Sequence, residues 1–211
     1  MNDSASNHSW VGATAGQIAR AVRRGDTTAV GVVADHLAHA EIAERVLGVI
    51  GNLRASSAIT EAEHVDEQAD LGALPLAGVP VLVRETVPVA GLPGPDGVAG
   101  ADHEVVRRLR GAGAVVLGTA RTGPVPNPWH TDRSAGGCGA AAAVALGMVP
   151  IAYADAAPVR VPAACCGLVG FTPAPGAGLV EAGGLTETGV LATSVADVAL
   201  GLDVLTGRRP A

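Results

Sequence analysis

Apolar residues in the first third of the chain recur at the spacing of α-helices. Thr14 is placed to cap one helix, and a second is expected from about Thr28 to Ala43. Residues 55–70 carry many Glu and Asp side chains, which predicts a third, solvated helix. We therefore expect residues 1–72 to form an N-terminal helical part.

From residue 73 onward, short apolar runs replace the helical spacing and alternate with helical stretches. The runs that predict strands lie at 79–83, 114–117, 149–154 and 167–171. Helices are expected at 102–111, where Asp102 is the predicted cap, at 139–147, and after Ser194 and Asp197. This alternation indicates an α/β fold, a mixed or parallel sheet covered by helices on both faces. We expect one domain over residues 1–211, with the α/β part at 73–211.

Ligands of such sheets bind in the loops beyond the strand ends. The loops at 84–100, 121–138 and 155–165 are therefore the candidate site.

Composition removes several classes of function. The chain has 48% hydrophobic and 16% charged residues and a net charge of −6, with no basic stripe, so a nucleic-acid partner is not expected. All fourteen cationic residues are Arg, which excludes a catalytic lysine. Residues 134–154 carry no charge, but glycines and Pro150 interrupt them, so a buried helix and strand are expected rather than a membrane span. Three cysteines, two of them adjacent, and no signal-like N-terminus predict a cytoplasmic protein.

Several ordered segments carry a specific resemblance. Gly78-Val79-Pro80 leads through an apolar run to Arg84-Glu85, and similar matches occur at 141–150, 160–170 and 194–197. Together these segments resemble the N-terminal part of the amidase-signature family. The resemblance implies an amidase-like α/β fold that stops before the family's C-terminal half. A sheet edge or apolar face would then be uncovered, and we expect self-association or a partner protein to cover it.

The same resemblance implies that the catalytic machinery is lost. Family members use a nucleophilic Ser, a bridging Ser and a Lys, and these positions fall on Pro158, Gly136 and Arg84. Proline and glycine have no hydroxyl, and a guanidinium stays protonated, so it cannot act as a general base. Losing one member of such a unit already costs on the order of 10⁴ in rate.

Three residues remain candidates for other chemistry: Arg84, Cys138 and His130. Cys138 lies in residues 134–140, which match the family's Gly/Ser-rich loop. It could act as a nucleophile if His130 and Asp132 supplied a base, but a buried, space-filling role is favoured. Arg84 either anchors a carboxylate or phosphate or pairs with Glu85 or Asp155. The residues expected to line a retained pocket are Arg84, Gly136, Gly137, Cys138, Asp155, Pro158 and Arg160.

No cofactor and no metal site are expected. His103-Glu104 lacks the second His of a zinc protease motif, because Arg107 stands in its place. His36 and His39 lie three apart on a predicted helix, a pattern typical of a solvated face.

Three hypotheses follow for function. The first is a catalytically degenerate family member that binds a small amide or acyl compound, in a non-hydrolytic or biosynthetic role. The second is a divergent enzyme that uses Arg84 and Cys138 for cyclisation, elimination, isomerisation or residual amide or ester hydrolysis. The third is a structural subunit of a larger amidase-like assembly.

Overall fold

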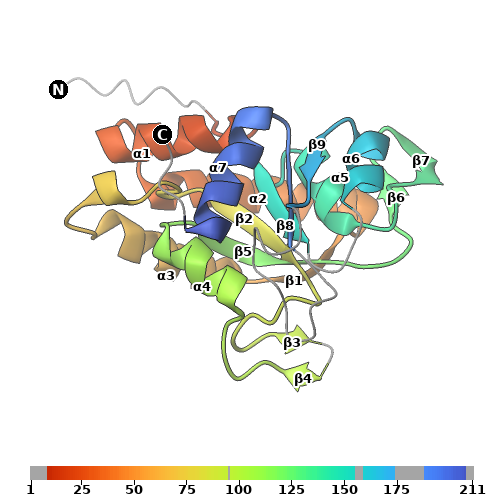
Figure 1. Cartoon of the computed structure of the whole chain (residues 1–211), viewed down its shortest axis with the longest axis horizontal. Helices are drawn as coiled ribbons and strands as arrows, with labels where there is room; N and C mark the ends of the chain where they lie inside the picture. The colour runs from red at the N-terminus through yellow and green to blue at the C-terminus, as the bar shows by residue number, and fades with distance from the viewer. Residues whose placement is uncertain (1–8, 95, 155–158, 174–187, 208–211) are drawn as a thin grey trace.

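A six-stranded sheet runs through the centre of the protein (Figure 1). This computed structural model describes residues 9–94, 96–154, 159–173 and 188–207. The strand order is β1-β5-β2-β8-β10-β9, in which β2 is parallel to β5 and β8 and the other pairs are antiparallel. The predicted mixed α/β sheet is confirmed. The strands are β1 (Ile50–Leu53), β5 (Val115–Ala120), β2 (Pro80–Arg84), β8 (Ile151–Ala154), β10 (Gly189–Ala192) and β9 (Val169–Phe171).

Helices cover both faces of this sheet. Figure 1 shows α4 and α7 in front of the central strands and α2 and α5 behind them. Within the described ranges, no helix combines the length and the apolar character needed to cross a bilayer. The helices are α1 (Ala15–Arg24), α2 (Ala29–Leu47), α3 (Ala55–Asp66), α4 (Glu104–Gly111), α5 (Gly139–Ala145), α6 (Arg160–Cys166) and α7 (Val195–Thr206), with a 3₁₀ turn at Leu71–Ala73.

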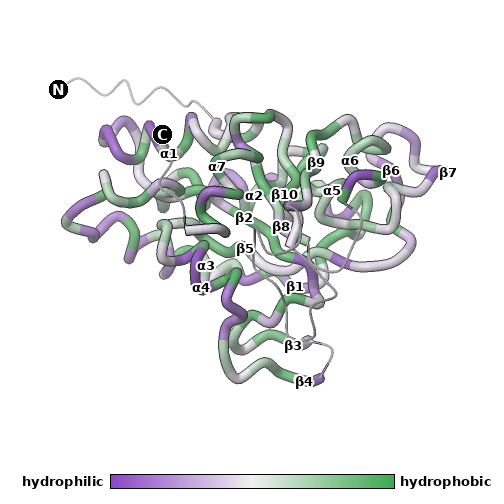
Figure 2. The backbone as a smooth tube through the Cα atoms, in the orientation of Figure 1, coloured by the Kyte–Doolittle hydropathy of each residue, from purple (hydrophilic) through white to green (hydrophobic). Residues whose placement is uncertain are grey.

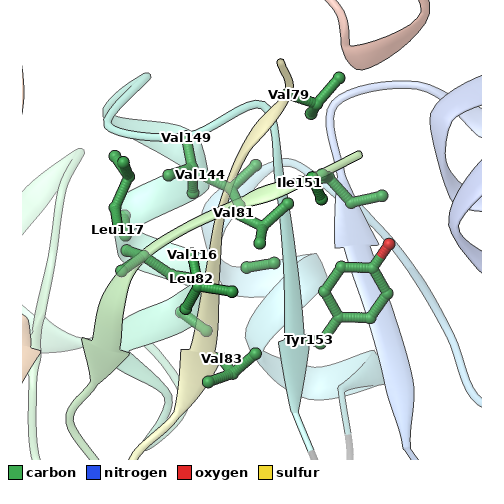
Figure 3. Close-up of a cluster of buried hydrophobic side chains, with 14 of the residues drawn as sticks. Val79, Val81, Leu82, Val83, Val116, Leu117, Val144, Val149, Ile151 and Tyr153 are labelled. Atoms are coloured by element: carbon green, nitrogen blue, oxygen red, sulfur yellow. The ribbon is translucent and has the colours of Figure 1, made fainter. Parts of the chain in front are cut away.

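The three parallel strands form the core. Every residue of β5 and β8 is buried, and so are the first four residues of β2. Parallel strands are enclosed in this way when helices lie on both faces, which explains why their sequences are apolar runs without alternation. Figure 2 shows the apolar colour concentrated in these strands, and Figure 3 shows their Val, Leu and Ile side chains packed together.

Helix caps largely follow the sequence. The Thr14 hydroxyl accepts a hydrogen bond from Gln17 N at 3.1 Å, while Gln17 Oε1 accepts one from Thr14 N at 2.9 Å, a complete capping box. Ser194 caps α7 through the N–H of Asp197 at 3.1 Å, as expected. The prediction for α4 is wrong, since its cap is His103.

The Asp102 carboxylate binds donors outside the first turn of α4. One oxygen accepts from Ala90 N at 2.8 Å, and the other pairs with Arg110. Arg110 also binds Glu61 of α3 at 2.8 Å, and Glu61 in turn binds Arg54 at 2.7 Å. This chain of charges ties α3, α4 and the loop before α4 together.

Several elements were not predicted. β1 falls inside the region expected to be helical and pairs with β5, so residues 1–72 contribute a strand to the sheet. α6 and β10 also went unpredicted. Two small hairpins occupy stretches that were expected to be loops, β3 (Pro93–Gly94) with β4 (Gly97–Val98) and β6 (Pro126–Asn127) with β7 (His130–Ser134).

The edge formed by β9 carries exposed apolar side chains. Phe171 of β9 is 47% exposed, Val161 of α6 is 57% exposed, and Trp129 of the β6–β7 hairpin is 68% exposed. Trp129 Nε1 donates to Cys166 O at 2.8 Å, which places its ring against the end of α6. The sequence led us to expect an uncovered sheet edge or apolar face without locating it. A covering partner stays a prediction.

The solvated face predicted for His36 and His39 is wrong. His36 is fully buried, and its Nδ1 lies 3.1 Å from the carbonyl oxygen of Met148. His39 Nε2 lies 2.7 Å from the carbonyl oxygen of Leu146. Both rings therefore fasten α2 to the turn between α5 and β8. Burial lowers the pKa of His36, more strongly than its hydrogen bond to Met148 and the nearby Asp35 raise it.

We expect His36 to make the fold sensitive to mild acid. Its folded pKa lies below the ordinary value of 6.5, so its contribution is complete above pH 6.5. As the pH falls below 6.5, the unfolded chain takes up a proton that the native protein resists. The free energy of unfolding then decreases by up to about 1.4 kcal/mol per pH unit.

Urea unfolding of the wild type and of His36→Gln between pH 7.5 and 5 measures this effect. The variant should lose less stability over this range than the wild type does. His64→Gln, a change at an exposed histidine of α3, is the matched control. Parallel pH profiles of wild type and His36→Gln would contradict the assignment.

Candidate functional site

The carboxyl ends of three strands meet at one edge of the sheet. β2 ends at Arg84, opposite Ala120 of β5, and Val83 lies opposite Tyr153 of β8. The three predicted ligand loops all start from this edge, where α/β proteins bind their ligands. Asp155 and Pro158 lie outside the described residues.

Arg84 is the last residue of β2, and Glu85 follows it directly. Glu85 N donates to Ala120 O at 2.9 Å, and its Oε1 accepts from Thr122 N at 2.7 Å and from the Thr122 hydroxyl. The Glu85 carboxylate therefore holds the loop after β5. Arg84 is half-buried beside it. The side chain of Glu85, one of the two partners considered for Arg84, accepts two hydrogen bonds from Thr122. Sequence reasoning missed this role of Glu85.

A cavity of about 340 Å³ opens next to Glu85. It is therefore located at the predicted edge and has the size of a small-molecule site. Its lining residues come from β1, from the segment after β2, from β3 and from the loop after β5: Asn52, Glu85, Thr86, Pro93, Gly94 and Thr122.

The loop at 134–138, which precedes α5 and matches the family's Gly/Ser-rich segment, approaches α6 closely. Gly136 and Gly137 both have φ of +77°, a conformation that side chains with a Cβ rarely adopt. A Cβ on Gly136 would lie 2.9 Å from Pro162 Cα and 3.0 Å from Pro162 N. A Cβ on Gly137 would meet only Gly123 O, at 3.7 Å. The position that matches the bridging serine therefore has no room for a side chain in this backbone.

Cys138 is a buried thiol. It is 1% exposed and stands at the cap position of α5, facing Thr122 across an isolated β-bridge. His130 and Asp132, the predicted base, lie on β7, where all five residues are exposed. The described residues show no hydrogen bond between Cys138 and either of them. These positions agree with a space-filling Cys138.

The other cysteines flank the end of α6. Cys166 is buried, and this burial, with Cys165 and Cys138 nearby, raises its pKa to about 11. Cys165 is exposed, and all three thiols are free. Arg160 is exposed at the first turn of α6. The structure thus gathers Arg84, Glu85, Thr122 and Cys138 near one edge and leaves His130 outside this group.

Comparison with known proteins decides the family. The model of the amidase family matches residues 31–211. The chain belongs to the amidase family. It is 36% identical to one of the subunits of the glutamyl-tRNA(Gln) amidotransferase of Deinococcus radiodurans, over 93% of this chain and 47% of that protein. It is also 36% identical to the putative amidase AmiA2 of Mycobacterium bovis, over 79% of this chain and 41% of that protein.

Solved structures agree with this assignment. The 6-aminohexanoate cyclic dimer hydrolase superposes with a TM-score of 0.82 at 30% identity, covering 94% of this chain and 47% of that one. A protein of a vestigial complex connected with the origins of an s-triazine catabolic enzyme superposes with a TM-score of 0.83 at 28% identity, over 93% and 50%. The chain spans about half the length of the relatives it matches.

Gly136→Ser is expected to destabilise the protein more than Gly137→Ser. Both substitutions place a Cβ at φ of +77°, which costs about 1–2 kcal/mol. Only the change at Gly136 also forces a Cβ against the backbone of Pro162, and such overpacking adds about 1–3 kcal/mol. Gly137→Ser is therefore the matched control for backbone strain. Equal urea midpoints for the two variants would show that the loop accommodates a serine at 136.

Proposed function

We propose that this chain is a catalytically degenerate member of the amidase family that binds a small amide- or acyl-bearing molecule without hydrolysing it. The backbone at Gly136 gives the strongest support. A bridging serine at this position requires movement of the loop or of α6, because Pro162 occupies the space of its Cβ. The proton path of ordinary amidase chemistry is then broken in the backbone as well as in the sequence.

The positions matching the Lys and the nucleophile support the same proposal. Arg84 stands where the resemblance places the general base, and the chain has no lysine to replace it. Pro158 stands where the resemblance places the nucleophile and has neither a hydroxyl nor a backbone N–H. The cavity beside Glu85 supports ligand binding, because it lies at the edge of the sheet where α/β proteins bind ligands and has the size of a small-molecule site.

We expect no amide turnover by the purified protein. Ammonia or aniline release from a panel of aliphatic and aromatic amides should stay at the level of a heat-denatured sample. Turnover that Arg84→Ala or Cys138→Ala abolishes, with the urea midpoint of the variant retained, would contradict the proposal. That result would establish the divergent-enzyme alternative.

A role within an assembly is the second candidate, and the exposed side chains along β9 support it. Apolar groups gathered beside the edge strand of the described sheet favour self-association or a partner protein. In sedimentation velocity at micromolar concentration, we expect a species heavier than the 20.8 kDa monomer.

Phe171→Ser should shift this species toward the monomer, because it removes an apolar side chain from the β9 edge. Ile42→Ser, at a 65% exposed position of α2, is the matched control and should leave the distribution unchanged. A wild-type protein that sediments as a monomer would exclude self-association through this edge.

A further inference from the structure

The cavity beside Glu85 presents oxygen acceptors. The described residues that line it supply one carboxylate, one carboxamide and two hydroxyls, and no described lining residue is cationic. Pro93 and Gly94 add an uncharged wall. The chemistry of this cavity therefore differs from that expected of a site built around Arg84.

Glu85 is fixed by one of its two carboxylate oxygens. Its Oε1 accepts two hydrogen bonds from Thr122, from the backbone N–H and from the hydroxyl. Its Oε2 has no hydrogen-bond partner within the part of the chain that the structure describes. A carboxylate whose position is already set loses little freedom when a ligand binds to it, which favours affinity.

Asn52 of β1 adds a second acceptor, two strands away from β2 in the sheet. Its Nδ2 donates to Thr119 Oγ1 at 3.2 Å, and this contact orients the amide. The amide oxygen, Oδ1, has no hydrogen-bond partner among the described residues. β1 carries Asn52 next to β5, and Thr122, which holds Glu85, follows β5 by two residues. Asn52 and Glu85 therefore line the same cavity.

We infer that this cavity binds the amino end of its ligand, a protonated primary amine. An ammonium group has three N–H donors and no acceptor, which matches a wall of oxygen atoms. Its charge strengthens the bond to Glu85, whereas a carboxylate or phosphate would be repelled by it. The inference rests on the proposed function, because both place a ligand at the same edge of the sheet, and it adds the charge and donor pattern of that ligand.

Three probes of equal length test this inference by isothermal titration calorimetry: butylammonium, butyramide and butyrate. Butylammonium should bind with the lowest Kd, butyramide more weakly, and butyrate without measurable heat. Butyrate binding as tightly as butylammonium would overturn the inference, and so would the absence of saturable butylammonium binding.

Variants locate the site. Glu85→Gln keeps an oxygen that can accept from Thr122 N but removes the charge, and it should weaken butylammonium binding about 10- to 100-fold. Glu41→Gln, on the exposed face of α2, makes the same change in net charge and should leave the Kd unchanged. Equal affinities of the Glu85→Gln and Glu41→Gln proteins would overturn the inference.

Asn52→Asp keeps the test decisive if Glu85→Gln fails to fold. The Thr119 hydroxyl can donate to the new carboxylate, so the contact between β1 and β5 is retained with its direction reversed. A second negative charge beside Glu85 should lower the Kd for butylammonium several-fold. An unchanged or higher Kd in this variant would overturn the inference.

The two proposals fail separately. Ammonia released from butyramide would refute the non-hydrolytic function and would leave the amine preference to be judged from the Kd values. Loss of the amine preference without ammonia release would refute only the inference about the ligand.

Discussion

The close approach of α5 to the sheet determines how the candidate site is built. Gly139 begins α5, and a Cβ on it would lie 2.6 Å from Val49 O and 2.9 Å from Arg121 O. Gly139 N donates to Arg121 O at 3.0 Å, so the helix starts directly on the segment that leaves β5. The next residues of α5 are alanines, all buried. Small side chains thus let this helix lie against the strands, and the loop before it is held between β5 and α6.

This constraint explains why the loop before α5 contains Gly136 and Gly137. Because α5 is fixed to the end of β5, the residues before it pass close to α6. A Cβ on Gly136 would lie only 2.9 Å from Pro162 Cα. Cys138 is then drawn into the core rather than toward solvent. The loop is part of the packing between α5 and α6.

The parallel strands could be predicted because their burial on both faces is written as uninterrupted apolar runs. β1 could not, since Ile50-Gly51-Asn52-Leu53 is a strand only through its pairing with β5. The burial of His36 was equally hidden, because its carbonyl partner comes from Met148, 112 residues away. Within the site, motif spacing identified Arg84 and Gly136, whereas the contact of Gly136 with Pro162 depends on the path of two loops. Glu85 was passed over because a Glu after Arg suggests a local ion pair, and only the structure shows it bound to Thr122.

Glu85 has a structural contact and also lines the cavity. Its Oε1 is needed for the fold, because two donors of Thr122 depend on it to fix the loop after β5. Its Oε2 takes no part in that contact, and the Glu85 side chain is among those that line the cavity. A substitution that preserves the loop must therefore keep an acceptor at this position, and a carboxylate is the acceptor that also attracts a cation. The structural requirement and the proposed ligand preference therefore favour the same residue at position 85.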